Sequence, residues 1–157
     1  KIGTDLPPQW HWHFEHDNKL VVERGLVGRE VECAVLEGIN GSKTRVSVAG
    51  EIIVTGREFY DFEAKYLDTG AVDLKIPTEL PAEQLKEMQE LSAKAFNALG
   101  CEGLARVDFF LTKDGFLVNE VNTMPGFTRL SMFPSLWQAS GLSYQELITE
   151  LIELALK

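Results

Sequence analysis

The chain has 157 residues, of which 45% are hydrophobic and 25% charged, and this composition is typical of one folded domain rather than of a disordered segment. Its 24 acidic and 15 basic side chains leave a formal net charge of −9. A nucleic-acid partner is therefore not expected, because an acidic surface repels a phosphate backbone. No apolar run reaches the length of about 18 residues that a membrane-spanning helix requires.

The start of the chain and its cysteines give no indication of secretion. Cys33 and Cys101 stand far apart and form no paired motif, which favours a reducing, cytoplasmic location. The chain opens at Lys1 without an initiator methionine or a signal sequence, so we expect it to be a piece of a longer protein.

Residues 1–19 show no regular periodicity, and we expect them to form an atypical lead-in to a domain at 20–157. All three histidines, His11, His13 and His16, fall in this lead-in. Their spacing allows a metal site. No cysteine or carboxylate pattern completes a coordination shell, however, so an exposed segment is the favoured interpretation.

Short β-rich runs follow the lead-in. The alternation at 30–35 predicts a strand with one buried face. Gly38–Lys43 does not match the spacing of a phosphate-binding loop and predicts a hairpin-type turn. The other predicted strands are residues 20–22, 45–49 and 51–55, and the last two are expected to form a hairpin that turns at 49–50.

Two helices and a long loop complete the outline. Residues 56–78 have little periodicity and predict a loop, and loops of that length are commonly functional. Pro81 and Gly100 predict the start and the stop of a helix at 81–99. A capping box at 143–146 predicts a second helix at 143–156.

A hairpin between the two helices carries the chemistry. Residues 104–111 and 116–122 alternate as strands, and a three-residue loop with a left-handed Gly115 would join them. This register places Asp108 opposite Glu120 and Arg106 opposite Asn122, with opposed Cβ atoms about 4.5–5.5 Å apart.

Two opposed carboxylates repel each other unless a cation lies between them. Asp108, Glu120 and Asn122 offer only oxygen ligands, which suit Mg²⁺ or Mn²⁺ rather than zinc. A solvated face with a simple Arg106–Asp108 pair is the alternative. Gly126 follows in a Pro-Gly turn, where its N–H, together with Arg106, can stabilise an oxyanion or a transferring phosphoryl group. A plain turn is the alternative there.

Three sequence blocks resemble one known family in order along the chain. Residues 100–128, GCEGLARVDFFLTKDGFLVNEVNTMPGFT, are similar to the C-terminal part of D-alanine–D-alanine ligases of the ATP-grasp superfamily. Residues 59–66, FYDFEAKY, resemble the mobile loop of this family. Residues 21–36, VVERGLVGREVECAVL, resemble its adenine-binding strand pair. The likeness covers about 20–157.

The resemblance implies an α+β fold, the ATP-grasp C-terminal subdomain, with a mainly antiparallel sheet covered by helices. It implies that ATP phosphorylates the carboxylate of one D-alanine and that the amine of a second D-alanine attacks the acyl phosphate. The product, D-alanyl-D-alanine, feeds peptidoglycan synthesis in the bacterial cytoplasm. The implied cofactors are ATP and two Mg²⁺ or Mn²⁺ ions. The parent protein is expected to be a homodimer, and this chain a monomer.

The resemblance also implies roles for single residues. It gives the two ions to Asp108, Glu120 and Asn122. It places Arg106 and the Gly126 N–H around the acyl phosphate and the tetrahedral intermediate. The remaining roles are adenine binding by Glu23, the Leu26 backbone and Phe59, ribose binding by Glu30, phosphate binding by Lys65, contact with the second D-alanine's carboxylate by Ser131, and preference for an alanine-type acceptor by Tyr66. Ser131 can alternatively cap a helix.

The family's N-terminal domain and its central lid subdomain are not recognised in this chain. We therefore expect little ligase activity from the chain alone. The alternatives are a non-catalytic fragment that binds Mg²⁺–nucleotide or only supports structure, and a ligase that uses D-serine or D-lactate as the acceptor.

Overall fold

The structure is a computed structural model that describes residues 19, 21–54 and 72–157. The predicted lead-in with its histidine cluster lies outside the described residues, apart from Lys19, and so does residue 20. The run at 59–66 lies outside them as well. The predicted strand at 20–22 is wrong at its two described positions, because 21–27 follow an irregular path.

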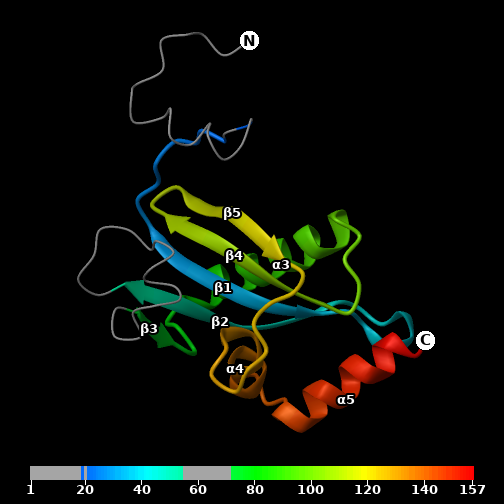
Figure 1. Cartoon of the computed structure of the whole chain (residues 1–157). Coiled ribbons are helices and arrows are strands. Elements are labelled where there is room, and N and C mark those ends of the chain that lie inside the picture. The colour runs from blue at the N-terminus through cyan, green and yellow to red at the C-terminus, as the bar shows by residue number, and fades with distance from the viewer. Residues whose placement is uncertain (1–18, 20, 55–71) are drawn as a thin grey trace.

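The described part of the chain forms a five-stranded sheet in which all neighbouring strands are antiparallel, in the order β3-β2-β1-β4-β5 (Figure 1). The expected α+β fold with an antiparallel sheet and covering helices is confirmed. The strands are β1 (Arg29–Leu36), β2 (Arg45–Val54), β3 (Val72–Lys75), β4 (Leu104–Thr112) and β5 (Gly115–Asn122). The helices are the short 3₁₀ turn η1 (Ile39–Gly41), α3 (Ala82–Ala98), α4 (Met132–Ala139) and α5 (Tyr144–Ala155).

Helix α3 packs on one face of the sheet, behind the strands in Figure 1. Met88 and Phe96 of this helix are buried against odd-numbered residues of β1 and β4. Those strand residues are Val31, Cys33, Val35, Ala105, Val107 and Phe109. The helix begins directly after Pro81, close to the predicted start, and the carbonyl of this N-cap residue accepts the Leu85 N–H at 2.9 Å.

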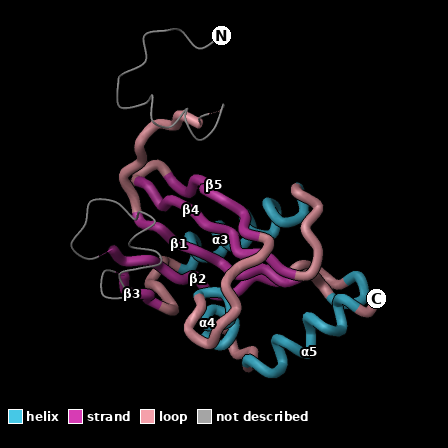
Figure 2. Tube along the Cα trace, in the orientation of Figure 1, coloured by secondary structure: helices cyan, strands magenta, loops and turns pink. Residues whose placement is uncertain are grey.

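Helices α4 and α5 cover only half of the opposite face (Figure 2). Ala34 and Leu36 of β1 lie buried under them, together with Phe133 and Leu136 of α4. The prediction that β1 buries one face was therefore wrong, because residues 31–36 are all buried. Beyond Ala34 the same face continues without a covering helix, and that uncovered half holds the polar side chains described below.

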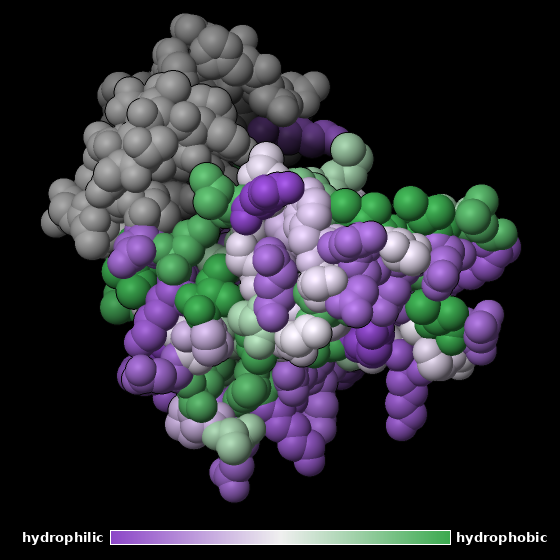
Figure 3. Space-filling view, turned by 90° about the horizontal axis from the view of Figure 1, so that it is seen from below, coloured by the Kyte–Doolittle hydropathy of each residue, from purple (hydrophilic) through white to green (hydrophobic). Residues whose placement is uncertain are grey.

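The predicted capping box at the start of α5 is confirmed. The Ser143 hydroxyl accepts the Glu146 N–H at 3.3 Å, and Glu146 Oε2 accepts the Ser143 N–H at 2.9 Å. Three exposed apolar side chains follow one another here, Ile148 and Ile152 on α5 and Leu156 at its C-cap. On the face seen from below, hydrophobic groups are interrupted by hydrophilic ones rather than joined in one patch (Figure 3).

The predicted hairpin at 45–55 is wrong, because β2 runs through Ala49-Gly50 as one strand. The glycine serves packing instead of a turn. A Cβ at Gly50 would lie 2.7 Å from Met132 Sδ and 3.0 Å from Leu136 Cδ2, so glycine lets α4 approach the strand. The predicted turn at 38–43 lies in the connection between β1 and β2, and the later part of the predicted loop at 56–78 contains β3.

The β4–β5 hairpin has the predicted pairing at its functional end, although its turn differs. Thr112 pairs with Gly115, so the loop has two residues instead of three, and Gly115 has a positive φ of 112°. Asn119 is an extra residue between the pairs Phe109–Val118 and Asp108–Glu120. This bulge compensates for the shorter turn, and from Asp108 to Arg106 the predicted register is restored.

Replacing Gly50 by valine is expected to lower the free energy of unfolding by about 1–3 kcal/mol, because the new side chain must displace Met132 and Leu136. Urea denaturation measures this loss. Gly25→Val is the matched control, since a Cβ there meets no atom within 4 Å. Equal stability of the two variants would contradict the packing role of Gly50.

Candidate functional site

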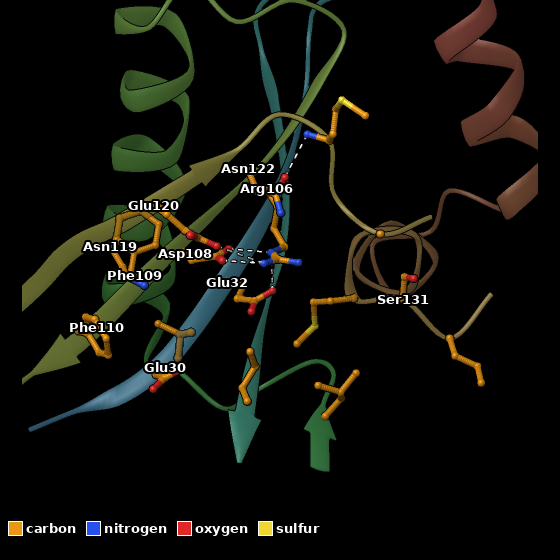
Figure 4. Close-up of a pocket in the computed structure, with 17 residues that line it drawn as sticks. Glu30, Glu32, Arg106, Asp108, Phe109, Phe110, Asn119, Glu120, Asn122 and Ser131 are labelled. Atoms are coloured by element: carbon orange, nitrogen blue, oxygen red, sulfur yellow. Dashed lines mark hydrogen bonds and ion pairs between the residues drawn. The ribbon is translucent and has the colours of Figure 1, made fainter. Parts of the chain in front are cut away.

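A cleft of about 940 Å³ lies on the half of the sheet that α4 leaves uncovered (Figure 4). Its floor is formed by β1, β4 and β5, and its wall by the segment that leads from β5 into α4. The polar residues that line it are Glu30, Glu32, Arg106, Asp108, Asn119, Glu120, Asn122 and Ser131. The cleft therefore collects the predicted metal and phosphate residues of the hairpin in one place.

Three neighbouring strands place one carboxylate each in a row across this floor. Glu32 of β1 is the register partner of Asp108 on β4, and Asp108 is the partner of Glu120 on β5. Exposure rises along the row, with side-chain exposed fractions of 3% for Glu32, 12% for Asp108 and 50% for Glu120. The row therefore extends from the buried sheet to solvent.

The guanidinium of Arg106 binds all three carboxylates. Its Nε and Nη2 donate to Asp108 Oδ1 and Oδ2, both at 2.7 Å, and form a two-pronged pair. Nε also lies 2.8 Å from Glu32 Oε2, and Nη2 lies 3.8 Å from Glu120 Oε1. A planar guanidinium suits this position because its fork matches the geometry of a carboxylate.

Arg106 stays charged in this environment. Burial by itself lowers the pKa of its guanidinium, but the hydrogen bonds to Asp108 and the negative charges of Glu32, Asp108 and Glu120 outweigh burial and raise that pKa. The group is therefore a permanent cation that offsets part of the negative charge in the cleft.

Sequence reasoning missed Glu32. The alternation at 30–35 predicted one buried face and gave this residue no role, whereas it is 2% exposed as a whole and lies against Arg106. The alternation of side chains along a strand could have indicated it, since this alternation puts Glu32 on the same face as Glu30 and Ala34. Pairing β1 with β4 was the missing step, and the sequence offered no local cue for that pairing.

The segment after β5 brings the other predicted residues to the cleft wall. Asn122 Oδ1 accepts the Met124 N–H at 3.0 Å, which holds the start of the Pro-Gly turn. Ser131 occupies the cap position of α4, but its hydroxyl accepts the Thr128 N–H at 2.9 Å and makes no capping bond to the helix. Gly126 stands close to this hydroxyl, because a Cβ there would lie 3.1 Å from Ser131 Oγ.

A second hollow of about 1000 Å³ adjoins the first at Glu30, Ile52, Phe110 and Asn119. The predicted adenine residues Glu23 and Leu26 line it, and Glu30 lines both hollows. Apolar side chains from three strands complete its surface, namely Ile52, Ile53, Phe110 and Val118. The structure thus places Glu23 and Leu26 in a hollow that adjoins the cleft of the carboxylate row. Phe59, Lys65 and Tyr66 lie outside the described residues.

The oxygen donors fit a hard divalent cation. Asp108, Glu120 and Asn122 line the same cleft and offer carboxylate and amide oxygens, as Mg²⁺ and Mn²⁺ prefer. Among the described residues, no three His, Cys, Asp or Glu side chains are grouped as a ready metal site. Both oxygens of Asp108 are bound to Arg106, so a cation would have to compete with this arginine.

Comparison with known proteins supplies the family. The model of the family "D-ala D-ala ligase C-terminus" matches residues 4–153. The chain belongs to this family. Its helices within the described residues include none long and apolar enough to cross a membrane.

Relatives in the D-alanine–D-alanine ligase family extend beyond this chain. A D-alanine–D-alanine ligase of Arthrobacter sp. (strain FB24) is 58% identical over 145 residues, which are 90% of this chain but 38% of that protein. The ATP complex of D-alanine–D-alanine ligase from Bacillus anthracis is 32% identical with a TM-score of 0.76, covering 94% of this chain and 46% of that one. The VanG D-Ala:D-Ser ligase from Enterococcus faecalis is 37% identical with a TM-score of 0.77, and the match covers 95% of this chain and 44% of that one.

A second ion pair joins β1 to β2 beside the second hollow. Arg29 Nε and Nη2 donate to Glu51 at 2.7 and 2.6 Å, and the Thr78 hydroxyl donates to Glu51 Oε2 at 2.5 Å. The hydrogen bond from Arg29 lowers the pKa of Glu51, and this effect exceeds the opposing effect of burial. The pair therefore ties β1 and β2 to the segment after β3.

Because the folded-state pKa of Glu51 is lowered, its ionised form stabilises the fold above the ordinary carboxyl pKa, and this stabilisation is lost as pH falls through the folded-state value. Glu51→Gln should destabilise the chain at neutral pH, and the difference from wild type should shrink near pH 3. Urea midpoints at the two pH values measure it. Glu102→Gln, at an exposed position, is the control, and a constant difference for Glu51→Gln would refute the role.

Proposed function

We propose that this chain is the part of an ATP-dependent D-alanine–D-alanine ligase that holds the metal-bound phosphates of ATP and the reacting carboxyl group. The observation that carries the proposal is the convergence of Arg106, Asp108, Glu120 and Asn122 on one cleft in a chain of this family. The ligase would join two D-alanines through an acyl phosphate, and the product would serve peptidoglycan synthesis.

The charge of the cleft explains why such a site would need cations. Glu30, Glu32, Asp108 and Glu120 all line it, and Arg106 is the cation among its described lining residues. Polyphosphate would be repelled by this excess of carboxylates. Asp108, Glu120 and Asn122 would hold two Mg²⁺ or Mn²⁺ ions, which neutralise the phosphate charge that develops during transfer.

Arg106 would stabilise the negative oxygens of the acyl phosphate and the tetrahedral intermediate. Its guanidinium is permanently charged and largely removed from water, where a fixed cation is most effective. The Gly126 N–H would donate to the same oxygens, since no side chain stands in the way. Ser131, on the same wall, would bind the carboxylate of the second D-alanine, and Tyr66 would contact the acceptor.

The nucleotide would lie along the two adjoining hollows. Glu23 and the Leu26 backbone would bind the adenine, Glu30 the ribose, and the phosphates would reach the carboxylate row. Glu30 lines both hollows and therefore stands where a group between base and phosphates must pass. Phe59 would stack on the adenine, and Lys65 would reach a phosphate.

D-alanine is the favoured acceptor because the relative at 58% identity is named a D-alanine–D-alanine ligase. D-serine is the second candidate, since a D-Ala:D-Ser ligase is similar at 37% identity, and D-lactate is a third. The alternative to a ligase is a non-catalytic fragment that binds a nucleotide or only supports structure. We further propose a cytoplasmic location and a homodimeric parent protein.

The isolated chain is expected to bind Mg²⁺–ATP without comparable turnover, because it spans 38% of the length of the Arthrobacter relative and its cleft is open to solvent on one side. Calorimetry measures the binding, and coupled ADP release with D-alanine measures the turnover. Turnover like that of an intact ligase would overturn this expectation.

A chimera tests the function itself. In it, this chain replaces the matching 38% of the Arthrobacter relative. The chimera should release ADP in the presence of D-alanine, and Asp108→Asn should lower kcat by about a hundredfold or more, because a metal-held charge is lost. Asp114→Asn, in the exposed hairpin turn, is the matched control. An inactive but folded chimera, or an Asp108→Asn variant of full activity, would contradict the proposal.

A further inference from the structure

Arg106 lies between two carboxylates, those of Asp108 and Glu32, and its guanidinium can pair with either one. Its Nε donates to Asp108 Oδ1 at 2.7 Å and lies 2.8 Å from Glu32 Oε2, which it contacts as an ion pair and not as a hydrogen-bond donor (Figure 4). Asp108 takes the whole fork, since its second oxygen also accepts from Nη2. Glu32 is therefore a second ion-pair partner for a guanidinium whose hydrogen bonds go to Asp108.

A divalent cation at Asp108 changes this balance. Arg106 and the cation are both positive, so they repel each other, and both compete for the oxygens of Asp108. The cation has the higher charge, and it also gains the ligands Glu120 and Asn122. The fork of Arg106 must then give up at least part of its hold on Asp108.

Glu32 offers the place to which the fork can turn. It lies on β1, the strand next to Asp108 on the side away from Glu120. The exposed fraction of its side chain is 3%, whereas that of Glu120 is 50%. A carboxylate at this depth is strongly destabilised when a cationic partner leaves it. A bound cation repels Arg106, and the buried carboxylate of Glu32 is stabilised by a nearby guanidinium. Both effects favour a movement of Arg106 from Asp108 towards Glu32.

We propose that Glu32 is a positioning residue that retains Arg106 in the cleft when a divalent cation takes Asp108. This inference rests on the proposed function, because it needs a cation at Asp108 and Glu120. Glu32 touches neither the cation nor a substrate in this account. It acts by keeping the guanidinium beside the phosphate oxygens instead of releasing it to solvent.

The side-chain Nε–Hε NMR signal of Arg106 provides the test, on the full chain with ADP and MgCl₂. In wild type the signal should shift on addition of Mg²⁺ but remain slow in exchange with water. In Glu32→Gln it should remain slow without Mg²⁺, because Asp108 still holds the fork. With Mg²⁺ its exchange should rise about tenfold or more, since a hydrogen bond to a charged group is lost.

This dependence on Mg²⁺ separates positioning from a merely structural role, which would alter Arg106 in both states. Asp114→Asn removes the same charge from the exposed hairpin turn and should behave as wild type. Equal exchange in Glu32→Gln and wild type with Mg²⁺ present would overturn the inference. If the backbone signals of Asp108 and Glu120 do not respond to Mg²⁺ in wild type, the proposed metal site fails, and the inference fails with it.

A second variant keeps the inference open to refutation if Glu32→Gln does not fold. In Asp108→Asn without Mg²⁺, Arg106 should already rely on Glu32, and its signal should be as slow in exchange as that of Mg²⁺-loaded wild type. Rapid exchange in Asp108→Asn, with the rest of the spectrum unchanged, would show that Glu32 cannot hold the guanidinium and would overturn the inference.

Discussion

The guanidinium of Arg106 allows three carboxylates to share one sheet face. Glu32, Asp108 and Glu120 come from three adjacent strands and would repel one another, and the first two are nearly withdrawn from water. Burying such charges is unfavourable unless they are paired and hydrogen-bonded. The strand order and the β4–β5 register bring these three groups to one cation and leave Glu120 at the exposed end of the row.

The cleft exists because α4 stops halfway across the sheet. The helix packs closely on β2 at Gly50 and buries Ala34, while Glu32, two residues along the same face, is beyond it. The segment that leads into α4 then forms the wall that carries Gly126 and Ser131. The change from Ala34 to Glu32 along one face of β1 thus marks the boundary between the apolar core and the polar cleft.

The sequence predicted best where local chemistry determines the structure. The capping box at Ser143 was confirmed because its two hydrogen bonds are local, and the pairing of Asp108 with Glu120 was confirmed although the turn was shorter than expected. A bulge at Asn119 compensated for the turn, which no propensity rule foresees. Gly50 was misread as a turn because its role depends on α4, which begins at Met132, 82 residues later in the chain. Glu32 was missed because its importance arises only from the pairing of β1 with β4.

The central claim is that Asp108, Glu120 and Asn122 form a divalent-cation site beside Arg106. A crystal of the chain grown with ADP and MnCl₂, measured for anomalous scattering from manganese, tests it most directly. The account predicts manganese peaks in the cleft bonded to oxygens of Asp108 and Glu120, with Arg106 turned towards Glu32. An ADP-bound crystal without such a peak, in which Arg106 still grips both oxygens of Asp108, would contradict it.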